Sequence, residues 1–93
     1  MTNILKIPKE LTEVYFSPRT WEEYQYIYIV LAAFSEVNVK KSYSQLLEFD
    51  FVNYPELYLE HNRGSYLITG YKRGRASVHL HRKLMTIEEL ERY

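Results

Sequence analysis

Apolar residues in the first third of the chain recur at helical spacing, from about residue 20 to residue 36. Pro18 is typical of a first helical turn, and Thr20 with Glu23 has the spacing of a capping box. Tyr26–Val30 is rich in β-formers and taken alone indicates a strand, but these start signals favour a helix. The helix would be apolar over more than half of its circumference, which predicts that it lies across a sheet.

The period of the pattern changes to two after residue 41. Leu47, Phe49 and Phe51 alternate with less apolar neighbours, as do Leu57 and Leu59. We therefore expect strands over residues 47–52, 57–60, 65–71 and 76–82. Turns are predicted at residues 61–64 and 72–75, where glycine allows a positive φ. Regular spacing of this kind is typical of an antiparallel meander.

The ends of the chain carry weaker signals. Thr86 and Glu89 again have capping-box spacing, so residues 85–93 are predicted to form a short helix. Residues 4–7 are β-prone and end at Pro8, and residues 9–16 are interpreted as a connecting segment.

These elements predict one α+β domain over residues 1–93. One long helix would pack on a three- to four-stranded antiparallel meander, with a short C-terminal helix. The alternative is a winged helix, with residues 42–48 and 55–61 as its second and third helices and residues 65–82 as the wing. The alternation of apolar residues over residues 49–59 favours the meander.

Composition narrows the class of protein. Apolar residues make up 46% of the chain and aromatic residues 16%, which excludes an intrinsically disordered chain. There is no cysteine, so disulfides and thiolate chemistry are excluded. The longest apolar run has nine residues, against the roughly 20 that cross a bilayer, and the first residues do not resemble a signal peptide. We expect a cytoplasmic protein without a cofactor.

Charge is segregated along a chain whose formal net charge is zero. Residues 1–60 contain five basic and nine acidic side chains, whereas residues 61–87 contain six basic and no acidic ones. Ten tyrosines are more than a small domain can bury, and exposed tyrosine favours protein recognition. The predicted partner-binding surface therefore consists of Tyr58, Arg63, Tyr66, Tyr71, Lys72, Arg73, Arg75, His79, His81, Arg82 and Lys83.

The histidines prompt two chemical alternatives. His79 and His81 would share one face of a strand, with His61 at the neighbouring end, but the surrounding cations and the lack of a nearby carboxylate weigh against a metal site. A metal-independent ribonuclease of the toxin type would use His81, Arg82, Lys83 and Tyr71. No spacing of ionisable groups requires catalysis, so we expect a protein that is not an enzyme.

The leading hypothesis is a small protein that occludes a partner protein's acidic or nucleic-acid-binding surface. Abundant Tyr, Lys and Asn with scarce Gly and Pro are typical of AT-rich bacteria and their phages, which indicates an inhibitor of a host defence or nucleic-acid-processing system. The alternative is a nucleic-acid-binding regulator that uses residues 63–83. A dimer through a sheet edge is left open.

Overall fold

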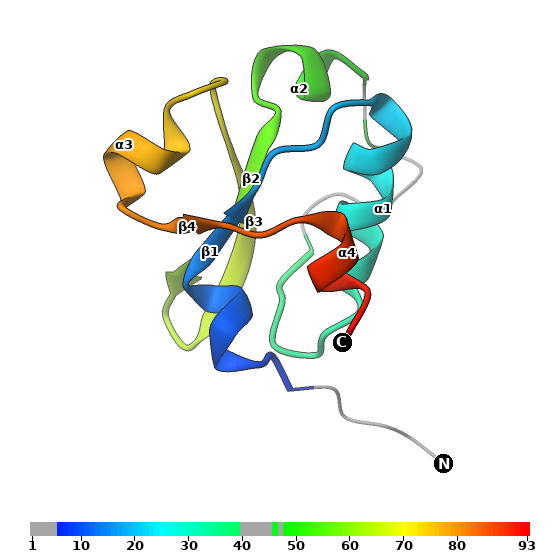
Figure 1. Cartoon of the computed structure of the whole chain (residues 1–93). Coiled ribbons are helices and arrows are strands. Elements are labelled where there is room, and N and C mark those ends of the chain that lie inside the picture. Colours follow the sequence, from blue (N-terminus) through cyan, green and yellow to red (C-terminus); the bar gives the residue numbers. More distant parts are fainter. Residues whose placement is uncertain (1–5, 40–45, 47) are drawn as a thin grey trace.

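The computed structural model describes residues 6–39, 46 and 48–93 (Figure 1). A sheet of four strands and several helices make up the fold, which confirms the predicted α+β class. In chain order the elements are η1 (Lys9–Thr12), β1 (Val14–Phe16), α1 (Trp21–Ala32), α2 (Glu48–Asn53), β2 (Glu56–Asn62), β3 (Ser65–Tyr71), α3 (Ala76–Leu80), β4 (Lys83–Leu84) and α4 (Ile87–Leu90).

The sheet is mixed, with the strand order β3-β2-β1-β4. β2 pairs antiparallel with β3 and with β1, whereas β1 pairs parallel with β4. The expected antiparallel pairing is confirmed for β2 and β3, but the expectation of a purely antiparallel sheet was wrong for β4, which pairs parallel with β1. The winged-helix alternative also fails at residues 55–61, because they form strand β2 rather than a helix. Its other helix, at residues 42–48, lies mostly outside the described residues.

The long helix α1 begins where its capping signals predict. The Thr20 side chain accepts a hydrogen bond from the Glu23 N–H at 3.1 Å, and the Glu23 carboxylate accepts one from the Arg19 N–H at 2.8 Å. The helix ends at Ala32, four residues before the predicted end. Beyond it the chain turns to pair with β3, since the Tyr66 N–H donates to the Glu36 carbonyl at 2.9 Å.

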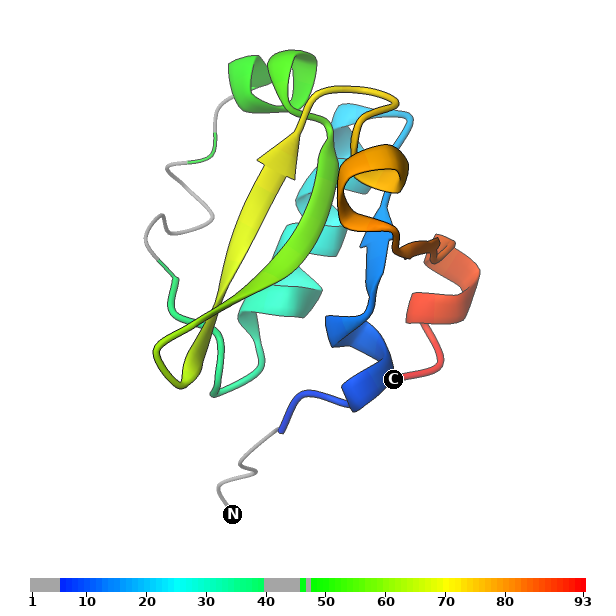
Figure 2. The same ribbon diagram turned by 90° about the vertical axis from the view of Figure 1, so that its left-hand side faces the viewer.

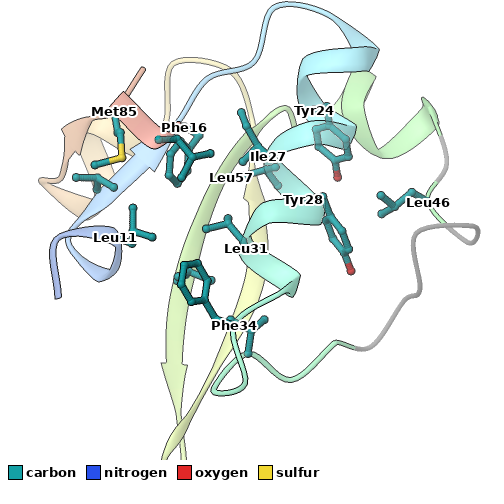
Figure 3. Close-up of a cluster of buried hydrophobic side chains, with 14 residues drawn as sticks. Leu11, Phe16, Tyr24, Ile27, Tyr28, Leu31, Phe34, Leu46, Leu57 and Met85 are labelled. Atoms are coloured by element: carbon teal, nitrogen blue, oxygen red, sulfur yellow. The ribbon is translucent and has the colours of Figure 1, made fainter. Parts of the chain in front are cut away.

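The core lies between α1 and one face of the sheet (Figure 3). Ile27 and Leu31 of α1 meet Phe16 of β1 and Leu57 of β2, and each of these four side chains is buried. Figure 1 shows α3 on the other side of the sheet from α1. The two faces of the sheet are therefore covered by different helices.

The predicted strand over residues 47–52 was wrong, because residues 48–53 form α2. Phe51 packs against Trp21 and Tyr24 of α1, with ring centroids 6.4 Å and 5.7 Å away. Phe49 and Val52 point to solvent. The apolar residues that alternate in the sequence lie on two faces of this short helix. A helix of six residues is too short for the helical period of 3.6 to be recognised in the sequence. Leu47 lies outside the described residues.

The predicted strand over residues 76–82 was also wrong, since residues 76–80 form α3. The Ala76 N–H donates to the buried Glu56 carboxylate at 2.9 Å, which ties the start of the helix to β2. His81 has a left-handed φ of 54° and ends the helix. The chain then enters β4, so only two residues extend the sheet.

Of the remaining predictions, some are confirmed and one is wrong. The turn at Arg63 and Gly64, both with positive φ, is confirmed, and the capping box of Thr86 and Glu89 opens α4 as expected. Residues 9–16 are not a connection, because they contain the interior strand β1, whose three residues are too short to show a period. The predicted strand at residues 4–7 lies mostly outside the described residues. Among the helices described, none combines the length and hydropathy that crossing a bilayer requires.

Candidate interaction surfaces

The predicted partner-binding residues lie on both faces and at both ends of the β2–β3 hairpin. Cross-strand pairing places His61 opposite Tyr66 and Leu59 opposite Ile68, so Tyr66 shares the α1 face with the core. Tyr58 and Tyr71 are each next in sequence to a residue on the α1 face, Leu59 and Gly70, and therefore lie on the opposite, α3 face. Arg63 stands at the hairpin tip and residues 72–75 at the other end of β3 (Figure 2). The structure thus does not bring all of them into one surface.

A stack of rings and cations forms on the α3 face. The Arg82 guanidinium carbon lies 5.0 Å from the centre of the Tyr58 ring. The Tyr58 ring stacks on Tyr71 at 5.3 Å, and Tyr71 stacks on His79 at 5.9 Å. Such contacts fix the positions of the side chains and leave the exposed imidazole of His79 at the outer end of the row.

Arg82 and Tyr58 are occupied inside the fold. Arg82 Nη1 donates to the Leu59 carbonyl at 3.0 Å and to the Val14 carbonyl at 3.4 Å. Tyr58 is 5% exposed, and burial, followed by the Glu60 and Tyr71 charges, raises the pKa of its hydroxyl. These two side chains hold β1, β2 and the end of α3 together. The phosphate-clamp role that a ribonuclease would give Arg82 has to compete with those carbonyls.

The basic turn remains accessible. Lys72, Arg73 and Arg75 are exposed, and Tyr71 and His79 border them on the stacked row. We name this set the basic turn surface: Tyr71, Lys72, Arg73, Arg75 and His79. His81 and Lys83 are also exposed, but they follow α3 and lie in or next to β4.

The three histidines do not form one cluster. The His61 ring contacts Tyr66 at 5.1 Å at one end of the hairpin, whereas His79 stacks on Tyr71 at the other. His79 and His81 do not share a strand face, because His79 belongs to α3 and His81 ends that helix. Within the described part of the chain, no three His, Asp or Glu side chains are grouped so that they could hold a metal ion.

The most exposed apolar side chains of the described residues were not predicted from the sequence. Phe49 is 66% exposed and Val52 70% exposed, one helical turn apart on α2. On the outer side of α1, Ile29 is also exposed. The available signal was the apolar circumference of the predicted long helix, since a helix covered on one side must leave its remaining apolar residues outward. For α2 no signal existed once residues 47–52 were interpreted as a strand.

Among the described residues, two exposed surfaces are candidates for contact with other molecules. One is apolar and is centred on Phe49 and Val52 of α2, and the other is the basic turn surface beside α3. Comparison of the chain with protein family models, with curated proteins and with solved structures gave no significant match.

Proposed function

We propose that this chain is a non-enzymatic binding protein that acts by occupying the surface of a partner protein. The observation that carries the proposal is the exposure of Phe49 and Val52 on α2. Full burial of a Phe or Val side chain is favourable by roughly 1.5–3 kcal/mol relative to leaving it in water. Burial of these side chains against a partner would recover that free energy.

The geometry of α2 supports the same proposal. Phe51 holds the helix against Trp21 and Tyr24, so Phe49 and Val52 are presented on a supported turn. Main-chain order beneath an anchor residue reduces the entropy lost on binding. A few well-placed apolar anchors supply most of the affinity in protein interfaces. We propose Phe49 and Val52 as these anchors.

The composition of the chain suggests the class of partner. Many tyrosines with few glycines and prolines are typical of phages and mobile elements of AT-rich bacteria. Small proteins of that origin commonly inhibit host defence or nucleic-acid-processing proteins. We therefore propose such a host protein as the partner, with the basic turn surface providing contacts to its acidic groups.

The experiment compares capture from a lysate of an AT-rich bacterium by the wild type and by two variants. Phe49→Ser with Val52→Ser removes the apolar anchors, and Thr12→Ser with Glu13→Gln is the matched surface control. We expect the wild type and the control to enrich the same protein, identified by mass spectrometry, and the α2 variant to lose it. Equal recovery by all three would contradict the proposal.

A second candidate function is nucleic-acid binding at the basic turn surface. Tyr71 and His79 are already stacked, and they border the exposed Lys72, Arg73 and Arg75. Aromatic rings beside cations bind unpaired bases and phosphates together. This candidate predicts an affinity that falls steeply with salt and drops when Arg73 and Arg75 become alanine, with Lys9→Ala as control. Binding that is insensitive to salt and to these variants would exclude it.

A further inference from the structure

α3 lies on the face of the sheet opposite α1 and buries little of its own surface (Figure 1). Ala76 at its first position is fully buried, but residues 77–79 are exposed, and Val78 is 61% exposed. By contrast, α1 buries two tyrosines, an isoleucine and a leucine. Because the free energy of burial scales with apolar area, α3 is held on the sheet far more weakly than α1.

Contacts with the β2–β3 hairpin hold α3 in place. The Ala76 N–H donates to the Glu56 carboxylate at 2.9 Å. The His79 ring stacks on the Tyr71 ring at 5.9 Å. Glu56 and Tyr71 pair across the two strands, so both contacts lie at the same end of the hairpin. A helix of five residues is not stable in water without such support, so α3 detaches and unfolds in one step.

The backbone is left-handed on both sides of α3. Gly74 has a φ of 79° and His81 a φ of 54°. Glycine adopts either sign of φ at little cost, whereas a residue with a Cβ is strained there, so opening of the segment releases strain at His81. The next residue, Arg82, is fixed to the sheet because its Nη1 donates to the Leu59 carbonyl at 3.0 Å. The segment that moves therefore ends at His81.

We propose that residues 75–80 form a flap that opens from the sheet while the core stays folded, with hinges at Gly74 and His81. The ring stack and the buried hydrogen bond hold the flap closed. In the open state the Tyr71 ring has lost its stacking partner and the Glu56 carboxylate its amide donor. The flap thus controls access to a ring and a carboxylate on one face of the sheet. It goes beyond the proposed function, because α2 takes no part in it.

Amide hydrogen exchange of the wild-type chain gives the first test. The amides of Ala76, Val78 and His79 are hydrogen-bonded in the closed flap. Because α3 detaches and unfolds in one step, these amides should share one opening, with protection factors smaller by roughly tenfold or more than those of β2. Protection equal to that of β2 would overturn the proposal. Amides without any protection would also overturn it, because the flap would then not close.

A change in the main core separates opening of the flap from unfolding of the whole chain. Ile27 is buried between α1 and the sheet, and Ile27→Val removes one methylene group there. It should lower the protection of the β2 amides by roughly threefold or more. The flap amides should stay within about twofold, because the closed and the open state both retain that core. A parallel decrease in both sets would overturn the proposal, since α3 would then open only when the whole chain unfolds.

The stacked ring is tested by His79→Asn, because asparagine has a similar helix propensity but cannot stack in the same way. We expect the protection of the flap amides to fall by roughly threefold or more. Ser77→Asn, at an exposed position of the same helix, is the matched control and should change it by no more than about twofold. Equal effects of the two variants would contradict the assignment of this stack as a contact that holds the flap closed.

Thiol labelling gives an independent readout, since the chain has no cysteine. Ala76→Cys places one thiol at a position that the closed flap buries. The thiol should react under native conditions, at a rate that Ile27→Val leaves unchanged. A thiol that does not react, or that reacts faster in the Ile27→Val background, would overturn the proposal. Phe49→Ser with Val52→Ser should leave this rate unchanged, so a failure of the flap is distinguishable from a failure of the binding surface on α2.

Discussion

The guanidinium of Arg82 lies over the ring of Tyr58 and donates Nη1 to the carbonyls of Leu59 and Val14. One side chain near the end of the sequence thus joins two neighbouring strands from the side opposite the main core. Tyr58 is buried there without belonging to the cluster around α1. Within the basic segment of residues 61–87, Arg82 therefore stabilises this second, smaller packing layer.

The Arg82 contacts predict a selective loss of stability. We expect Arg82→Ala to lower the free energy of unfolding by about 2 kcal/mol, because two carbonyl hydrogen bonds and a cation–π contact are lost together. Arg73→Ala, on the exposed turn, should change it by no more than about 0.5 kcal/mol. Urea denaturation measures both. Similar values for the two variants would mean that Arg82 is no more than a surface residue.

Glu56 is predicted to stabilise the fold mainly through the hydrogen bonds that its carboxylate oxygens accept. It is 5% exposed, accepts from the Ala76 N–H at 2.9 Å and lies 3.5 Å from the Ser17 hydroxyl. Glu56→Ala should cost about 2–4 kcal/mol, since the Ala76 N–H loses its acceptor in a buried place. Glu56→Gln keeps an oxygen there and should cost clearly less.

The readout for Glu56 is urea denaturation together with the exchange rate of the Ala76 amide. That amide should exchange faster in Glu56→Ala than in Glu56→Gln. Glu60→Ala, on the same strand but exposed, serves as control. Unchanged exchange at Ala76 in both Glu56 variants would show that the carboxylate does not anchor α3.

A side chain at Gly70 is predicted to destabilise the fold. A Cβ added there would lie 2.8 Å from the Tyr54 carbonyl oxygen and 2.9 Å from the Tyr54 Cβ. Because the obstacle includes main chain, Gly70→Ala should cost about 1–3 kcal/mol. Gly74→Ala meets no atom within 4 Å but has a φ of +79°, so its cost should be backbone strain of about 1 kcal/mol. Thermal or urea unfolding that ranks Gly74→Ala as the more harmful change would contradict this contact.

Tyr24 is expected to make the fold sensitive to alkali. Burial, with added repulsion from Asp50 and Tyr28, raises the pKa of its hydroxyl from 10.0 to about 12. The folded state therefore holds this proton more tightly than the unfolded state does. The associated stability is complete below about pH 10 and decreases as the pH rises towards about 12.

Tyr24→Phe isolates that effect, because phenylalanine keeps the ring and has no proton to lose. Between about pH 9 and about pH 11, the wild type should lose about 1 kcal/mol more unfolding free energy than Tyr24→Phe. Urea midpoints measured at each pH give the difference. Parallel loss in both proteins would show that the Tyr24 hydroxyl ionises equally well in the folded state.

Helix starts and the hairpin turn could be predicted from the sequence, because interactions between residues close in sequence determine them. Thr20 with Glu23 and Thr86 with Glu89 mark helix starts because capping involves residues three positions apart. Gly64 marks the hairpin turn because its φ of 83° is costly for other residues. Leu57 and Leu59 of β2 marked a strand because residues two positions apart on a strand point to the same face, here the face covered by α1.

Other features were decided by contacts between distant residues. Residues 48–53 and 76–80 carry patterns compatible with strands, and they become helices because Phe51 packs on Trp21 and Glu56 receives the Ala76 N–H. β1 is recognisable only once β2 and β4 lie beside it. The candidate surfaces follow the same rule. The sequence indicated cations and tyrosines, but the phase of β3 placed Tyr66 on one face and Tyr71 on the other, and packing alone left Phe49 outside.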